Sequence, residues 1–203
     1  SLIAGLVAML GFITNALVVT TQRYLSFHKA QSNVDVLRKL FANSLFIHIV
    51  IGTVIVVLLI AVMGLFFSDV LKIDPLRVET AKKVYVITVF MLLMTILTSP
   101  FKALFIANEN ILFIVIVEIL DSIIKLVLAI ILAYVTIDKL LVYAWMNALI
   151  IGLNLFVFSL YGLFRFPECS ILIRRNDLKG SYIKMMTGFA GWTIYGMGCA
   201  AAR

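Results

Sequence analysis

Three ionisable residues lie inside one long apolar stretch of the sequence, residues 111–137. They are Glu118, Asp121 and Lys125, and their i, i+3, i+7 spacing places them on one face of an α-helix. Asp121 and Lys125 are an i, i+4 pair and can form an ion pair, which would leave Glu118 as an unmatched carboxylate. Such a cluster could couple substrate movement to protons or cations, or hold the polar head of a substrate. The alternative is a structural ion pair that fixes this helix to a neighbour.

Two asparagines could also contact a substrate. Asn15 continues a stripe of small residues, ending in Gly11, along one face of the first apolar run. Small residues permit close packing, so the stripe predicts a helix–helix contact, with Asn15 lining a cavity as the alternative. Asn154 is an i, i+7 neighbour of Asn147 on a later run. Their shared face indicates either packing or substrate contact.

Three basic side chains stand near or within apolar runs. Arg23 ends the first run, where a guanidinium can bind phosphate through two hydrogen bonds or anchor the helix at the membrane surface. Arg203 lies in the last run and would be an intramembrane cation on a transport path if that run continues. His48 stands alone in the second run, and such a histidine is more often packed than a proton relay.

The composition indicates an integral membrane protein. Of 203 residues, 64% are hydrophobic and 13% are charged, and the mean hydropathy is +1.15. A soluble domain has about 45–50% apolar and about 25% charged residues. These numbers exclude a disordered chain, a collagen-like repeat and a disulfide scaffold, and they argue against a soluble globule. The two cysteines are isolated, so neither a disulfide nor a zinc site is expected.

A membrane-spanning helix needs about 20 mostly apolar residues. We expect six such helices because lipid permits no unpaired backbone and because residues 54–60 lack the alternation of a barrel strand. Pro100 should kink or end the third helix, since it lacks a backbone N–H. The six expected ranges are 1–22, 41–67, 83–105, 111–136, 140–164 and 182–203.

The connectors between these helices differ in charge. Ten cations belong to the first, third and fifth connectors: Arg23, Lys29, Arg38, Lys39, Lys102, Arg165, Arg174, Arg175, Lys179 and Lys184. Five belong to the second and fourth: Lys72, Arg77, Lys82, Lys83 and Lys139. The positive-inside rule then predicts that the first set is cytoplasmic. If the N-terminus of the whole protein is also cytoplasmic, we expect an odd number of further spans, most simply one, upstream of residue 1. The net charge of +7 therefore reflects topology, and no nucleic-acid partner is expected.

Three segments resemble one family. Residues 98–109, read as TSPFKALFIANE, precede the apolar helix with the two carboxylates. Residues 20–27, TTQRYLSF, are similar to the end of the family's second helix, and residues 188–196, GFAGWTIYG, to the start of its seventh. The chain thus resembles the O-antigen-type polysaccharide flippases of the multidrug/oligosaccharidyl-lipid/polysaccharide exporter superfamily.

The resemblance implies an all-α, MATE-like membrane fold of two six-helix lobes around a central cavity. Residues 1–164 would form five helices of the N-terminal lobe, 165–181 a cytoplasmic amphipathic connector between the lobes, and 182–203 the start of the second lobe. Within the connector, residues 170–177 could form a short interfacial helix, with a solvated loop as the alternative.

The resemblance also implies a function. Such proteins flip a polyprenyl-pyrophosphate-linked oligosaccharide across the bacterial inner membrane by alternating access, and a polysaccharide-assembly machinery is a possible partner. No metal or other cofactor is expected, apart from coupling to H⁺ or Na⁺. Head-group candidates are Arg23, Lys125, Arg203, Asn15 and Asn154. Candidates for ion coupling or charge balance are Glu118 and Asp121.

Three other functions compete with this one. A drug or cation antiporter of the same superfamily would need an acidic cavity with few cations, and the mixed charges around Asp121 do not decide between the two. A membrane-embedded prenyl-phosphate transferase would need an acidic metal motif near the membrane surface, whereas Glu118 and Asp121 lie too near the middle of their helix. A passive membrane scaffold would need no polar cluster.

Overall fold

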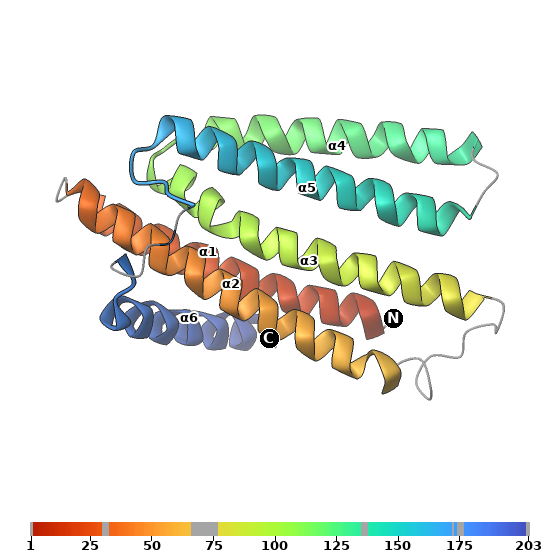
Figure 1. The fold of residues 1–203 in the computed structure, drawn as a ribbon, viewed down its shortest axis with the longest axis horizontal. Coiled ribbons are helices and arrows are strands. Elements are labelled where there is room, and N and C mark those ends of the chain that lie inside the picture. Colours follow the sequence, from red (N-terminus) through yellow and green to blue (C-terminus); the bar gives the residue numbers. More distant parts are fainter. Residues whose placement is uncertain are drawn as a thin grey trace.

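The computed structural model describes residues 2–29, 33–65, 77–134, 138–171, 173 and 177–201. Those residues contain no strand and form six α-helices: α1 (Leu2–Lys29), α2 (Val34–Leu65), α3 (Val78–Ala107), α4 (Ile111–Tyr134), α5 (Lys139–Arg165) and α6 (Gly180–Ala201). Figure 1 shows the helices side by side with their long axes roughly aligned. The all-helical class is confirmed, and each expected range falls on one helix.

The helices alternate in direction, so their ends gather at two ends of the bundle. The C-termini of α1, α3 and α5 and the N-termini of α2, α4 and α6 lie at one end (Figure 1, left). We call it the basic end, because Lys29, Arg38, Arg165 and Lys179 lie there. It is the end that the cation count predicts to be cytoplasmic. The other end, where α2 and α4 finish and α3 and α5 begin, is called the opposite end.

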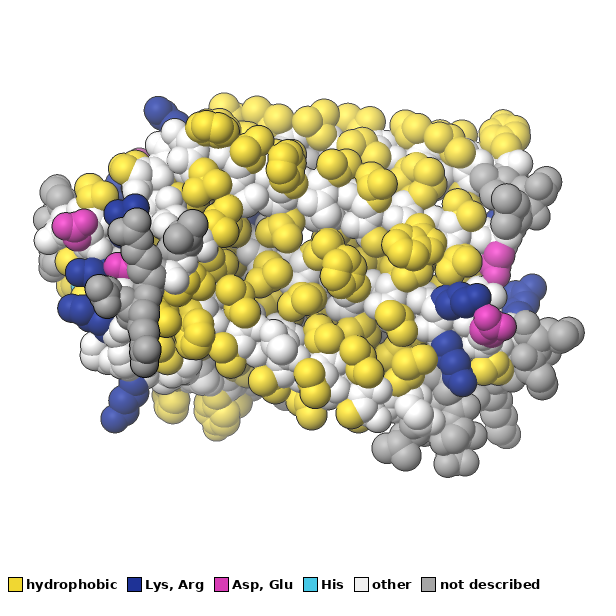
Figure 2. Space-filling view, in the orientation of Figure 1, with side chains coloured by type: hydrophobic (Ala, Val, Ile, Leu, Met, Phe, Trp, Pro, Cys, Tyr) yellow, Lys and Arg dark blue, Asp and Glu magenta, His cyan; other side chains and the backbone are white. Residues whose placement is uncertain are grey.

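Charged and apolar side chains are separated along the bundle. Figure 2 shows hydrophobic side chains over the middle of this face and most Lys, Arg, Asp and Glu side chains at its two ends. Among the described residues, three helices are long and apolar enough to cross a membrane: α2 over Val34–Gly64, α3 and α5. The chain therefore has the character of a membrane protein. Spanning by α1, α4 and α6 stays a prediction.

Local sequence explains where two helices begin. The Asn33 side-chain oxygen accepts hydrogen bonds from the backbone N–H groups of Asp35 at 3.1 Å and Val36 at 3.3 Å, which caps α2. The Asp138 carboxylate likewise accepts from the N–H of Leu140 at 3.3 Å and caps α5. Both caps satisfy amide donors that have no partner inside the helix.

The largest core cluster lies toward the basic end and is built around α3, which packs against α1, α2, α4 and α5. Phe105 stacks on Phe113 of α4 at 5.2 Å and meets Phe158 of α5 edge-on at 5.6 Å. Phe113 in turn stacks on Tyr161 at 4.0 Å. These offset and edge-on contacts between rings add to the burial that joins α3, α4 and α5.

Pro100 lies inside α3 and does not end it. The helix continues to Ala107, and Pro100 is buried. Of the two effects expected for this proline, an end of the third helix is wrong, and a kink stays a prediction. Because α3 continues past Pro100, Lys102, counted above as a connector cation, belongs to α3. Arg23 is likewise internal to α1, which runs on to Lys29.

The connector after α5 begins as a buried segment. Phe166, Glu168 and Cys169 are buried. The Asn108 side-chain amide donates to the Glu168 carboxylate at 2.9 Å, and a β-carbon at Gly162 would lie 3.2 Å from the Cys169 sulfur. The start of the connector is therefore packed against the ends of α3 and α5.

A second contact fixes the end of this connector to α2. The Asn43 side chain donates to the Asp177 carbonyl at 2.8 Å and accepts from the backbone N–H of Lys179 at 3.1 Å. The described part of the connector, residues 166–171, 173 and 177–179, contains no α-helix. The remaining residues of the suggested interfacial helix lie outside the described residues.

Candidate functional site

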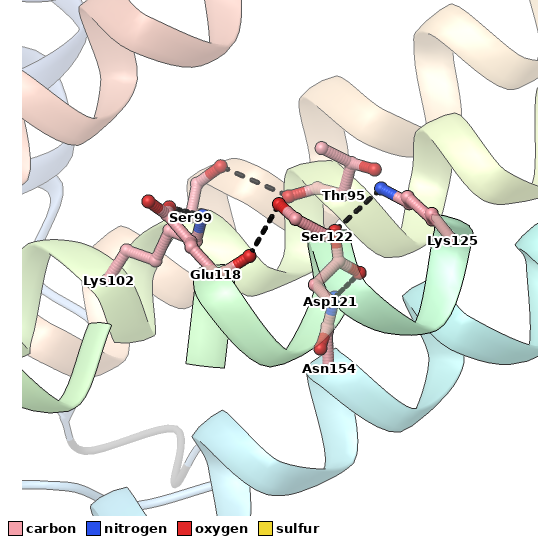
Figure 3. Close-up of polar contacts among 8 residues, drawn as sticks. All are labelled: Thr95, Ser99, Lys102, Glu118, Asp121, Ser122, Lys125 and Asn154. Atoms are coloured by element: carbon pink, nitrogen blue, oxygen red, sulfur yellow. Dashed lines mark hydrogen bonds and ion pairs between the residues drawn. The ribbon is translucent and has the colours of Figure 1, made fainter. Parts of the chain in front are cut away.

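Two ion pairs and one amide contact bring together α3, α4 and α5. The Lys102 ammonium of α3 lies 2.8 Å from the Glu118 carboxylate of α4. One turn further along α4, the Asp121 carboxylate lies 2.7 Å from the Lys125 ammonium. Asp121 also accepts a hydrogen bond from the Asn154 side chain of α5 at 2.8 Å (Figure 3). The predicted pair between Asp121 and Lys125 is present.

The inference that Glu118 would be unmatched was wrong. Its partner, Lys102, was missed because it was counted among the connector cations, although the expected third helix, 83–105, contains it. The signal that could have identified it is its spacing from two hydroxyl residues of α3, Thr95 and Ser99, which share one helical face with it at i, i+4 and i+7. Figure 3 shows this trio beside the α4 residues.

The cluster lies well inside the length of α4. At a rise of ~1.5 Å per residue, Glu118 is ~10 Å and Lys125 ~21 Å from the first residue of a helix ~36 Å long. Figure 1 places the start of α4 at the basic end. If α4 spans a membrane, these charges lie near the middle of the hydrocarbon layer.

One side of α4 differs from the rest of its surface. Glu118, Ser122 and Lys125 are exposed and lie within about 60° of one another on a helical projection. We call this side, together with Thr95 and Lys102 of α3, the polar flank. The remaining exposed surface of α4 is covered by large aliphatic side chains, among them Leu112, Ile116, Ile119, Leu120, Ile123, Leu126 and Ile130.

The exposure of the polar flank determines what can surround it. The side chains of Glu118 and Lys125 are 58% and 44% exposed, whereas that of Asp121 is 15% exposed. A charge facing lipid at the centre of a bilayer costs about 2.5–3.5 kcal/mol. Water, a polar substrate or further protein is therefore the favourable neighbour of this flank, and lipid is not.

Arg23 does not contact this cluster and lies instead where α1 meets α6. Its guanidinium lies 4.5 Å from the centre of the Phe189 ring of α6, a cation–π contact. The adjacent Tyr24 meets the same ring edge-on at 6.0 Å. Arg23 is exposed and could still reach a ligand. Its position at the junction of α1 and α6 also gives it a structural role.

Asn15, Asn147 and Arg203 are the other polar residues that the sequence singled out within apolar runs. Asn15 and Gly11 are both exposed on α1, so within the described chain the end of the small-residue stripe does not pack against a helix. Asn147 is buried and donates to the carbonyl of Tyr143 at 2.9 Å. Arg203 lies outside the described residues.

His48 is packed inside the bundle. Its Nδ1 lies 2.7 Å from the carbonyl of Ser44, and the Ser44 hydroxyl lies 2.7 Å from that of Thr21 in α1. Its Nε2 has no hydrogen-bond partner among the described residues. These contacts fit the packed histidine expected from the sequence.

The described residues contain no group of three or more His, Cys, Asp or Glu side chains that could hold a metal ion. Comparison of the chain with protein-family models, curated proteins and solved structures finds no match.

Proposed function

We propose that this chain is part of a membrane transporter in which the polar head of a substrate moves along the polar flank. The observation that supports this most directly is the Lys102–Glu118 ion pair, which is partly exposed within the length of two otherwise apolar helices. Ionisable groups at this depth usually face a bundle interior or a water-filled cavity. A structural role alone does not require that the pair remain open to solvent.

The proposed substrate is a polyprenyl-pyrophosphate-linked oligosaccharide of bacterial surface polysaccharide synthesis, as the resemblance implies. Lys102 and Lys125 each have a carboxylate partner that a pyrophosphate could replace. This exchange would bind the anion without leaving an unpaired ammonium in the cluster. Asn15, Asn154, Arg23 and Arg203 remain candidates for the same head group.

The proposed transport cycle is alternating access between two lobes of a MATE-like fold in the bacterial inner membrane. Glu118 and Asp121 would become free when the lysines bind substrate. They could then balance charge or take up H⁺ or Na⁺, which would couple the cycle to an ion gradient. A polysaccharide-assembly machinery would be the partner on the side of the membrane where the substrate is released.

A drug or cation antiporter is the second candidate. The cluster contains two carboxylates and two ammonium groups, so a cationic substrate could instead displace the lysines. The two candidate functions differ in which side chains of the ion pairs they require. An anionic head group requires Lys102 and Lys125, whereas a cationic drug requires Glu118 and Asp121.

Polysaccharide export by the intact parent protein in its own cells tests the proposal. Lys125→Ala and Lys102→Ala should each reduce surface polysaccharide while membrane insertion is unchanged. Lys139→Ala, which removes an exposed cation at the opposite end, is the matched control and should leave export unchanged. Normal export in both cluster variants would exclude the head-group role, and loss of drug resistance with normal polysaccharide would favour the antiporter.

A further inference from the structure

A long apolar groove lies on another part of the bundle, between α2, α3 and α5. Its volume is about 930 Å³. The floor includes Ile87 and Ala148, which are buried where α3 meets α5 and belong to a small core cluster with Ala144. Trp145 and Leu149 of α5 also line the groove. No residue of the polar flank lines it, so it is a separate site.

The lining changes from charged to apolar along the groove. Two lysines of the first turns of α3, Lys82 and Lys83, lie at the mouth, at the opposite end of the bundle. The other lining residues are apolar and include Phe90 and Met94 of α3 and Trp145, Leu149 and Gly152 of α5. In Figure 2 basic and acidic side chains gather at the right-hand end, and the surface toward the middle is hydrophobic. The groove thus has a cationic mouth and an apolar body.

The length of the groove matches one leaflet of a bilayer. The lining residues run from Lys82 to Met94 on α3 and from Leu141 to Gly152 on α5. Each stretch rises ~17 Å along its helix. The hydrocarbon of one leaflet is about 15 Å thick. A chain that begins at the headgroup level beside the lysines would therefore end near Met94 and Gly152.

The charge at the mouth favours an anionic headgroup. Lys83 lies 2.8 Å from Glu79, and their side chains are 59% and 82% exposed. Exposed ion pairs of this kind contribute little, about 0–1 kcal/mol. Lys82 also has a partner within the chain and is exposed. A lipid phosphate could therefore compete with Glu79 for Lys83 and with the partner of Lys82 for that lysine. A neutral lipid would lack this contact.

We propose that this groove binds an anionic phospholipid, with one acyl chain along α3 and α5 and the phosphate at Lys82 and Lys83. The site is independent of the proposed transport function. A lipid here would be held against the packed α3–α5 contact. A lipid in the groove would therefore stay bound, whereas lipids around the outward face of α4 would exchange with the rest of the bilayer.

Gly152 permits a variant that closes the groove at its inner end. A β-carbon at this position would lie 3.6 Å from the Met94 sulfur, which is an ordinary contact. A leucine would therefore enter the groove without a backbone clash. Gly188 of α6 has nothing within 4 Å of an added β-carbon and is exposed. Gly188→Leu is the matched control for Gly152→Leu.

The probe is phosphatidylglycerol with a photoactivatable diazirine at the end of one acyl chain, at low content in phosphatidylcholine vesicles that hold the full chain. Crosslinks should map to residues 90–94 and 145–152. Gly152→Leu should reduce them about fivefold or more, because it removes apolar contact area from the chain end. Gly188→Leu should leave them unchanged.

The headgroup is tested with a second pair of variants. Lys82→Gln with Lys83→Gln should lower labelling about tenfold, since each cation near a lipid phosphate strengthens binding. Arg77→Gln with Lys139→Gln removes the same charge at the same end, outside the groove, and should have little effect. The same diazirine placed on phosphatidylcholine should label the groove weakly.

Three results would overturn the proposal. Labelling spread evenly over the outward face of α4 would mean that the probe contacts the protein only as bulk lipid, which exchanges with the bilayer. Unchanged labelling in Gly152→Leu would mean that the chain does not lie in the groove. Absence of labelling in the groove would mean that protein covers it.

Discussion

The Lys102 ammonium of α3 lies 2.8 Å from the Glu118 carboxylate of α4, and the two residues come from opposite sides of the α3–α4 turn. α4 otherwise packs mainly on α5. The pair is therefore the polar link between the central helix and the helix that carries Asp121 and Lys125. It also means that both carboxylates of the predicted cluster have lysine partners.

Reversal of this pair is the first prediction. Lys102→Glu or Glu118→Lys places like charges together and should destabilise the protein by about 1–3 kcal/mol, whereas the exchanged double variant should recover at least half of the loss. The measurement is unfolding in detergent micelles. Lys83→Glu, in the exposed pair with Glu79, is the control and should cost less than about 1 kcal/mol. Equal costs in the single and double variants would contradict a direct contact.

The second prediction concerns Asp121 and its two partners. Lys125→Gln leaves Asp121 hydrogen-bonded to Asn154, while Asp121→Asn leaves the Lys125 ammonium unpaired. Each should cost about 1–3 kcal/mol, less than the 3–5 typical of a fully buried pair, because Lys125 is 44% exposed. The double variant should be milder than either single one in the same unfolding measurement. A double variant with the summed cost would show that the two residues act independently.

The third prediction separates two roles of Arg23. Arg23→Ala and Phe189→Leu both remove the cation–π contact and should each cost about 0.5–1 kcal/mol. If Arg23 also binds the head group, only Arg23→Ala lowers polysaccharide export. Arg38→Ala, an exposed cation at the same end, is the control and should leave export unchanged. Equal export in Arg23→Ala and Phe189→Leu would mean that Arg23 only packs against Phe189 and does not bind the head group.

The fourth prediction is a difference in cysteine reactivity. Burial and the neighbouring Glu168 carboxylate raise the pKa of Cys169 to about 12. The reactive thiolate is then ~1,000-fold scarcer at neutral pH than for an ordinary thiol with a pKa near 9. Cys199 is exposed. Between about pH 7 and pH 9 a maleimide should leave Cys169 of the folded protein unlabelled and should label it only after denaturation, whereas Cys199, at the surface of α6, should react wherever it meets water. Fast labelling of Cys169 in the folded protein would contradict the buried connector.

The number and order of the helices could be predicted from the sequence because apolar runs of that length have no other stable form in lipid. Helix ends could not, because polar residues continue helices past the apolar runs. Thus α1 runs beyond Arg23 to Lys29, and α3 runs through Pro100 to Ala107.

The cluster was only half predictable for a related reason. The i, i+4 spacing of Asp121 and Lys125 is a property of one helix and can be read from the sequence. The contacts of Glu118 with Lys102 and of Asp121 with Asn154 join different helices. They depend on how α3 and α5 are rotated against α4, which helical spacing does not specify.

The proposed function requires that the polar flank faces water, and the reactivity of cysteines placed at Ser122 and Ile123 measures this. Both are exposed at the same depth of α4, but Ser122 lies on the polar flank and Ile123 on the aliphatic face. Each is replaced by cysteine in a Cys199→Ala background, and a charged methanethiosulfonate is added to both sides of the membrane. Ser122→Cys should react at least about tenfold faster, because a thiol ionises only in contact with water. Equally slow reaction at both positions would contradict a wetted flank and, with it, the proposed transport path.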